Sequence, residues 1–268
     1  MKRRRREAFL KKTKEKTQEI LTSRDILLGR ISRTIEELND VINELSGRLK
    51  DMYDVYFPEL DMQDNEKLIQ IVAIFEKGKV DAGALSKIVG SGKANEIINH
   101  GKKSAGGEFT EEDIFECRRL AQAIKEIFEL KAKYEDYLEK VAKEICPNMA
   151  YVAGAAVAAK LIAHVGSLRK LALLPASTIQ VLGAERALFK HLKNKRVKPP
   201  KHGIIFQHPK ISNSPKKVRG KIARTLASKI ASAAKADSFT QNFIAKDLKD
   251  QFDRRVEDVL KNAKKVKE

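Results

Sequence analysis

Three histidines, His191, His202 and His208, lie close together in the C-terminal half of the chain. Neutral imidazole is a common zinc ligand, so such a group raises the question of a metal site. Their spacing matches no standard zinc pattern, no cysteine pair lies nearby, and the surrounding lysines disfavour a dication. We therefore expect no metal. For each histidine, contact with RNA and an ordinary, partly exposed imidazole both stay open.

The run Gly90-Ser91-Gly92-Lys93 resembles part of a phosphate-binding loop. It departs from that pattern because Lys87 stands at the leading glycine position and Ala94 replaces the Ser or Thr that follows the lysine. The chain also lacks a nucleophile elbow and a dinucleotide fingerprint after a strand. We therefore expect no catalytic residue and no cofactor, so that the chain is a binder rather than an enzyme.

Positive charge is concentrated in one stretch of the chain. Between Asn148 and Ala236 there are 18 Lys and Arg residues and a single acid, Glu185, a net of +17 against +18 for the whole chain. Concentrated charge over a folded segment is typical of a protein that binds nucleic acid. The basic run Lys2–Arg6 leaves three interpretations open: a localisation signal, a nucleic-acid tail or a solvated helix end.

Within that stretch, the segment Lys216–Ala236 reads as a basic helix. Its cations recur at helical spacing, and no acid appears before Asp237. A solvated helix face normally mixes both signs, so we interpret this face as a phosphate-binding surface. The cations that we assign to this face are Lys217, Arg219, Lys221, Arg224, Lys229 and Lys235.

Two long apolar seams must position this surface. The first repeats every three or four residues and stops at Phe57-Pro58, because proline cannot continue a helix. The second is preceded by a cap at Thr110 and ends at Pro147. The first seam consists of Leu28, Ile31, Ile35, Leu38, Ile42, Leu45, Leu49, Met52 and Tyr56. The second consists of Leu120, Ile124, Ile127, Lys131, Tyr134, Leu138, Val141 and Ile145.

The simplest way to bury both seams is for the two helices to pack against each other as an antiparallel hairpin. We expect short helices and a loop over residues 61–109 at the tip of this hairpin. Apolar surface left over would allow a second copy of the chain to bind. We expect self-association into a dimer through Leu38, Ile42, Leu45, Leu49, Ile127, Tyr134 and Leu138.

The remainder of the chain also favours an all-α fold. Only 14 Gly and 7 Pro residues argue against an all-β architecture. We expect a helix over Ala150–Ala163, a short extended run at Gly203–Phe206 and a charged tail helix from Phe239. Cys117 and Cys146 have no disulfide spacing, which indicates a reducing, cytoplasmic location, and no segment is apolar enough to span a membrane.

Three strings of residues resemble the Nop domain. They are Gly183-Ala184-Glu185-Arg186-Ala187-Leu188-Phe189, the run from Pro199 to Pro209, and Lys229 through Phe239. The chain resembles the archaeal Nop-family scaffold of box C/D ribonucleoprotein particles, which guide RNA 2′-O-methylation, from about Ile20 to its end. The resemblance implies a basic segment over residues 1–19, a coiled-coil domain over 20–147 and a compact helical Nop domain over 148–268.

The resemblance also implies partners. The family's Nop domain recognises a kink-turn in the box C/D guide RNA that is already bound by a small ribosomal-protein-like partner, and its coiled coil mediates self-association. In many members of the family, an N-terminal domain binds the fibrillarin methyltransferase. Because residues 1–19 are short for such a domain, we expect a reduced fibrillarin contact through the basic N-terminal helix and the coiled coil, or a truncated chain.

Carried onto this sequence, the resemblance places a helix start at the turn Gly183-Ala184-Glu185, and helix starts suit anions. Glu185, an acid in a basic field, is assigned to capping or to a basic residue of the protein partner. The RNA-facing set is Lys190, Lys201, His202, Gln207, Arg219, Lys221, Arg224 and Lys229, whereas Phe206 and His208 are assigned to the fold. Two alternatives stay open: an assembly factor of the spliceosomal U4 particle, and a coiled-coil DNA-packaging protein.

Overall fold

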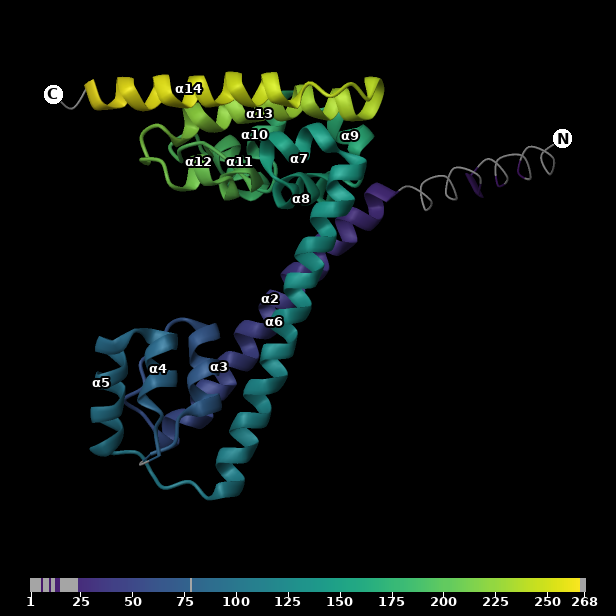
Figure 1. Cartoon of the computed structure of the whole chain (residues 1–268). Helices are drawn as coiled ribbons and strands as arrows, with labels where there is room; N and C mark the ends of the chain where they lie inside the picture. The colour runs from purple at the N-terminus through teal and green to yellow at the C-terminus, as the bar shows by residue number, and fades with distance from the viewer. Residues whose placement is uncertain (1–5, 7–9, 11–12, 15–23, 78, 266–268) are drawn as a thin grey trace. The chain divides into compact units, whose positions relative to one another are not determined.

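The computed structural model describes residues 24–77 and 79–265, together with residues 6, 10, 13 and 14. These residues form helices and connecting loops, and no strand occurs among them (Figure 1), which confirms the predicted all-α class. The chain divides into a larger unit, residues 1–34 with 135–268, and a smaller unit, residues 35–134. Most of the predicted N-terminal segment, residues 1–19, lies outside the described residues.

The smaller unit contains parts of the two long helices, α2 (Arg24–Tyr56) and α6 (Glu111–Ile145). They run antiparallel within this unit. Lys131 donates to the side chain of Asn39 at 2.9 Å, while Tyr56, at the far end of α2, stacks on Phe109, just before α6. Lys131, the one polar member of the second seam, therefore has a polar partner opposite it.

Three shorter helices complete the smaller unit: α3 (Asn65–Ile74), α4 (Ala82–Val89) and α5 (Ser91–Lys102). The carboxylates of Asp64 and Asp81 each accept two backbone N–H groups and so cap α3 and α4. The predicted cap of α6 is confirmed, because Thr110 and Asp113 exchange hydrogen bonds between their side chains and backbone N–H groups. The run Gly90–Lys93, which resembles a phosphate-binding loop, forms the junction of α4 and α5.

The predicted seam residues mostly face this unit's own core. Ile42, Leu49 and Ile124 are fully buried, and Leu45 and Ile127 pack against the same cluster. The prediction for Met52 was wrong: its side chain is 45% exposed, whereas Tyr53 is buried beside the stacked rings of Phe57 and Phe75. The apolar stripe moves by one residue there because Tyr53 joins the core in place of Met52, and its hydroxyl donates to the carbonyl of Phe75.

The larger unit is a helical domain arranged around α13 (Arg219–Lys235), which packs against α7 (Pro147–Ala153), α9 (Leu168–Leu173), α10 (Ala176–Val181) and α14 (Ala245–Lys265). Figure 1 shows α14 lying along α13. One face of α13 is a row of fully buried residues. Small side chains in that row let the neighbouring helices approach closely. The row comprises Ile222, Ala223, Leu226, Ala227, Ile230, Ala233 and Ala234.

Four sequence-based boundaries in this unit were wrong. The helix expected over Ala150–Ala163 is broken at Gly154, where φ is +86°, into α7 and α8 (Ala155–Val165). The run expected to be extended is instead a 3₁₀ turn, η1 (Ile204–Gln207). The basic helix begins at Arg219, so Lys217 precedes it. The tail helix begins at Ala245, after the π-helical turn η2 (Ala236–Thr240).

A buried polar contact joins the two ends of this domain. The Asp237 carboxylate accepts the backbone N–H groups of Asn148 and Met149, at 3.0 and 2.9 Å, and the side-chain amide of Asn148. Asn148 in turn accepts the N–H of Ile244. Asp237 therefore caps the start of α7 from a position 89 residues away, and it holds the segment that leads into α14.

No single helix in the described ranges has the length and apolar composition of a membrane span, although α7 and α8, bent by 118°, meet that test as a pair. Both cysteines are free and buried.

Candidate nucleic-acid interface

Two of the predicted site segments are joined by their backbones in the larger unit. The N–H of Gly203 donates to the carbonyl of Gln180 at 3.0 Å, and the N–H of Ile204 donates to the carbonyl of Leu182 at 2.7 Å. The Gln180 side chain also donates to the carbonyl of Lys201. The turn before α11 (Glu185–Lys193) and the loop before η1 are therefore one structural element.

Glycine is required on both sides of this junction. A Cβ on Gly203 would lie 1.9 Å from the carbonyl oxygen of Leu182, which no real side chain tolerates. Gly183 has a φ of +81°, and a Cβ there would lie 2.7 Å from the side chain of Ile204. These contacts explain why the two glycines stand in the strings that carry the resemblance.

Glu185 stabilises the same turn from within the chain. Its Oε1 accepts the N–H of Gly183 at 2.7 Å and the ring N–H of His164 at 2.8 Å. Burial pushes the pKa of the Glu185 carboxyl up, but the hydrogen bonds from Gly183, its own N–H and His164 outweigh burial, and the pKa lies below its ordinary value. The hydrogen bond to Gly183 stabilises the turn before α11, the predicted capping of α11 and contact with a protein partner stay predictions, and His164 is a partner that the sequence did not indicate.

Helix α11 carries apolar and basic side chains together on the surface. None of its residues is buried, and Phe189 and Leu192 are 60% and 53% exposed. Lys190 and Lys193 are exposed on the same helix. The sequence signal for this surface is an apolar pair, Phe189 and Leu192, interleaved with lysines in a short helix. Such a mixture fits a surface that contacts protein and nucleic acid side by side.

The predicted RNA-facing cations fall into two groups. Lys190, Lys201, Lys221 and Arg224 are exposed, as is the amide of Gln207. Lys201 also lies against Gly220, since a Cβ on that glycine would meet the Lys201 side chain at 3.5 Å, so the basic loop reaches the start of α13. Lys229 differs, because its ammonium donates to Gln251 of α14 at 2.5 Å.

Arg219 was predicted to face RNA, and the structure gives it another role. Its guanidinium donates to the carbonyls of Ser214 and Ser212, at 2.7 and 2.8 Å, and lies 5.2 Å from the ring centroid of Phe206. His202 stacks on the same ring at 4.5 Å. Burial, followed by the charges of Arg219 and Lys201, lowers the pKa of His202. Arg219 therefore positions the loop around Phe206.

The three histidines make separate contacts. The ring of His191 bonds the carbonyl of Val197, His202 stacks on Phe206, and His208 is buried edge-on against Phe252. In the described part of the chain, no group of three His, Cys, Asp or Glu residues could hold a metal ion. The assignment of His208 to the fold is confirmed by its burial and by the Lys210 N–H that its Nδ1 accepts.

His208 predicts a pH dependence of stability. Burial, and then the charges of Lys249 and Lys210, lower the pKa of His208 from 6.5 to about 4. Between these values the unfolded chain holds a proton that the folded chain lacks, so stability falls as the pH decreases through that window. We expect His208 to account for a loss of about 3 kcal/mol between pH 7 and pH 4. Urea denaturation of the protein and of the His208→Gln variant at several pH values measures this difference; parallel pH profiles would contradict it.

Known proteins are similar to this chain over most of its length. The family model named Nop, described as "snoRNA binding domain, fibrillarin", matches residues 34–258. A NOP5 family protein of Methanocaldococcus jannaschii, itself uncharacterized, is 41% identical over 250 residues, which cover 92% of this chain and 60% of that protein.

Two yeast relatives and a solved structure agree with that match. In Schizosaccharomyces pombe, nucleolar protein 56 is 36% identical over 214 residues and nucleolar protein 58 is 34% identical over 219, covering 77% and 81% of this chain. The chain spans 43% of each of these two proteins, less than two thirds of the relatives' lengths. A chain in the crystal structure of a fibrillarin/Nop5p complex is 28% identical, with a TM-score of 0.55 over 96% of this chain and 78% of that one.

Proposed function

The chain belongs to the Nop family, and from that premise we propose that it is a non-catalytic, RNA-binding scaffold of a box C/D particle. In this proposal it binds the kink-turn of a guide RNA together with a small ribosomal-protein-like partner, and it positions fibrillarin for guided 2′-O-methylation. The resemblance inferred from the sequence is confirmed at the level of the family.

The observation that carries this proposal is the composition of α11. An exposed Phe189 and Leu192 would be unfavourable in a surface that contacts only phosphates, and exposed lysines would be unfavourable in the centre of a purely apolar protein interface. Both kinds of side chain are satisfied when RNA and protein bind together. The rigid Gly183–Gly203 junction supports α11 at its start, so the surface is formed before binding.

We also propose that the chain binds fibrillarin, on the basis of its similarity to known proteins. The solved relative was crystallised as a complex with fibrillarin, and the family description names it. We propose that the basic N-terminal residues and the coiled-coil helices contribute this contact. The fibrillarin-binding segment is best located by cross-linking the two purified proteins.

The composite surface predicts a selective defect in the Phe189→Ser, Leu192→Ser variant. Its affinity for the RNA–protein complex is expected to fall at least about tenfold, because exposed aromatic anchors dominate interface energies. Affinity for the bare RNA should change little, since both substitutions are neutral in charge. The control is Leu173→Ser, which removes an apolar side chain on α9 that is even more exposed (70%). An equal loss with bare RNA would contradict the composite surface.

We propose that the chain forms a dimer through residues other than those predicted from the sequence. Ile42, Leu49 and Leu138 are buried within the chain, and Leu38, Leu45, Ile127 and Tyr134 are only partly accessible. The smaller unit does expose apolar side chains on its two long helices. They are Val41, Met52 and Val55 on α2, and Phe115 and Leu130 on α6.

We expect the Met52→Asp, Val55→Asp variant to be a monomer at micromolar concentration while the unmodified chain is a dimer. The reason is that association would bury two charges in an apolar contact. Sedimentation equilibrium measures the mass of each. Leu173→Asp, which adds a charge on the larger unit, is the control and should leave the dimer intact. A monomeric unmodified chain, or a dimeric variant, would show that this surface does not mediate association.

A further inference from the structure

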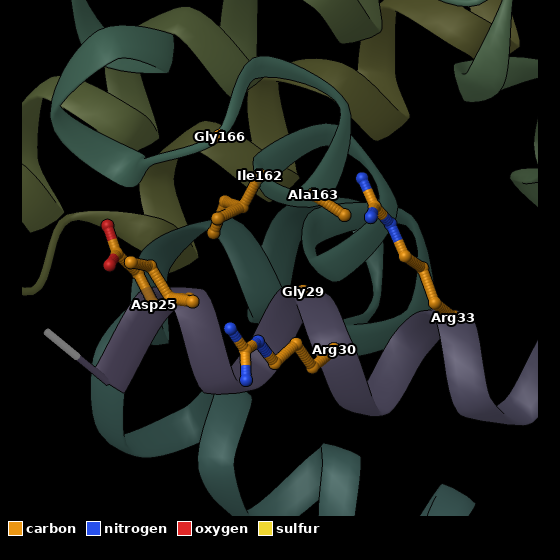
Figure 2. Close-up of a pocket in the computed structure, with 8 residues that line it drawn as sticks. Asp25, Gly29, Arg30, Arg33, Ile162, Ala163 and Gly166 are labelled. Atoms are coloured by element: carbon orange, nitrogen blue, oxygen red, sulfur yellow. The ribbon is translucent and has the colours of Figure 1, made fainter. Parts of the chain in front are cut away.

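A pocket of about 270 Å³ lies in the larger unit, between the start of α2 and the end of α8 (Figure 2). Gly29, Ile162, Ala163 and Gly166 form its apolar part, and Arg30 and Arg33 line it from α2. None of these residues belongs to the surface built by α11 and α13. The pocket is therefore a second feature of the same unit.

Close packing of α2 on α8 creates this pocket. A Cβ on Gly29 would lie 3.2 Å from the Cα of Ala163, so the two backbones approach each other closely at that point. The longer side chains on either side of Gly29 cannot enter this contact, and they border it instead. Figure 2 shows the Arg33 side chain rising from α2 beside Ala163, and the Arg30 side chain extending along the same helix.

The two arginines are exposed. Arg24, nearly two turns before Arg30, pairs with Glu144, but neither Arg30 nor Arg33 has a carboxylate at ion-pair distance in the described ranges. Asp25 also lines the pocket, but its side chain is buried and its Oδ2 accepts the N–H of Leu168 at 2.9 Å. The pocket is thus lined by two guanidinium groups that leave α2 in different directions, and each suits the oxygens of a phosphate.

The pocket also adjoins the proposed interface through α8. Ile162 and Ala163 line the pocket, and the next residue, His164, donates to Glu185 at the start of α11. Its volume is below the roughly 300–1,000 Å³ of pockets that enclose a whole small ligand. An extended backbone that crosses the pocket fits this size better than an enclosed nucleotide does.

We infer that Arg30 and Arg33 bind a phosphodiester of the same RNA that contacts α11 and α13, so that the RNA path continues onto the first turns of α2. This inference rests on the proposed function, because it names a further contact for the RNA of that proposal. The ligand is recognised through its phosphate charge and not through its bases.

The test compares the full chain with the Arg30→Ala, Arg33→Ala variant in binding a box C/D RNA at several salt concentrations. Each lost phosphate contact lowers the log–log salt slope by about 0.7 to 0.9, and lowers affinity at 0.1 M salt about five- to eightfold. We expect a loss of one or two such contacts. The Arg30→Lys, Arg33→Lys variant should keep the slope, because it keeps the charge. The Arg48→Ala, Arg119→Ala variant, with an equal charge change on the smaller unit, should behave as the unmodified chain.

The outcomes separate this inference from the function on which it rests. If the unmodified chain binds RNA and the Arg30→Ala, Arg33→Ala variant shows the same slope and affinity, the RNA contact is overturned while the scaffold function stands. If the unmodified chain does not bind RNA, the scaffold function itself fails. If millimolar inorganic phosphate perturbs the arginine side-chain NMR signals but the RNA slope is unchanged, the pocket takes a free anion and the RNA contact is again overturned.

Discussion

Reversing the charge of Lys221 and Arg224 together is expected to weaken RNA binding by more than about 25-fold at 0.1 M salt, the effect of two lost phosphate contacts at five- to eightfold each. Both side chains are exposed on α13, while Ile222 and Ala223 between them are fully buried. The substitutions Lys221→Glu and Arg224→Glu should therefore leave the fold unchanged. The salt dependence of the affinity, measured by fluorescence anisotropy, should fall in parallel.

The control for this variant carries the same change in net charge elsewhere. Lys133 and Lys140 are exposed on α6, outside the candidate interface. We expect Lys133→Glu with Lys140→Glu to bind RNA within about twofold of the unmodified chain, apart from weak long-range electrostatics. Equal weakening by both pairs would mean that net charge, and not the α13 surface, determines the affinity.

The largest effect on stability is expected for Asp237→Ala. This carboxylate is buried and accepts three N–H groups of Asn148 and Met149, and its removal leaves those donors without a partner. Burial raises the pKa of Asp237 despite these hydrogen bonds. Leaving a buried N–H donor without a partner costs about 1–3 kcal/mol, and three such donors are affected. Denaturation by urea at pH 7 measures this loss, and Asp250→Ala, on the exposed side of α14, should cost less than about 0.5 kcal/mol. A loss below about 1 kcal/mol for Asp237→Ala would show that α7 does not depend on this cap.

The long helices could be predicted from the sequence because their signals are local. The heptad spacing, the cap at Thr110 and the stops at Pro58 and Pro147 each act within one or two turns. Met52 was misplaced because the choice between it and Tyr53 depends on α3, which packs against α2 from another part of the chain. Gly154 was missed because glycine within an apolar helical pattern reads as tolerated until its positive φ is known.

The candidate site, like the fold, has features that the sequence could predict and features that it could not. The concentration of positive charge indicated the exposed cations Lys190, Lys221 and Arg224 correctly as surface residues. The intrachain contacts of Arg219 could not be predicted because its partners are backbone carbonyls, which no side-chain pattern reveals. The contact between Glu185 and His164, like the cap from Asp237 to α7, joins residues far apart in sequence, so single-sequence spacing carries no signal for either.

The most direct test of the proposed function compares three ligands for the unmodified chain in one gel-shift series. They are a box C/D RNA, the same RNA saturated with the small kink-turn-binding protein, and duplex DNA of equal length. If α11 recognises RNA and protein together, the complex should bind more tightly than bare RNA by about five- to 150-fold, the usual range of coupling between two ligands, and more tightly than DNA. Equal affinity for all three ligands would contradict the composite interface and favour a nonspecific basic protein.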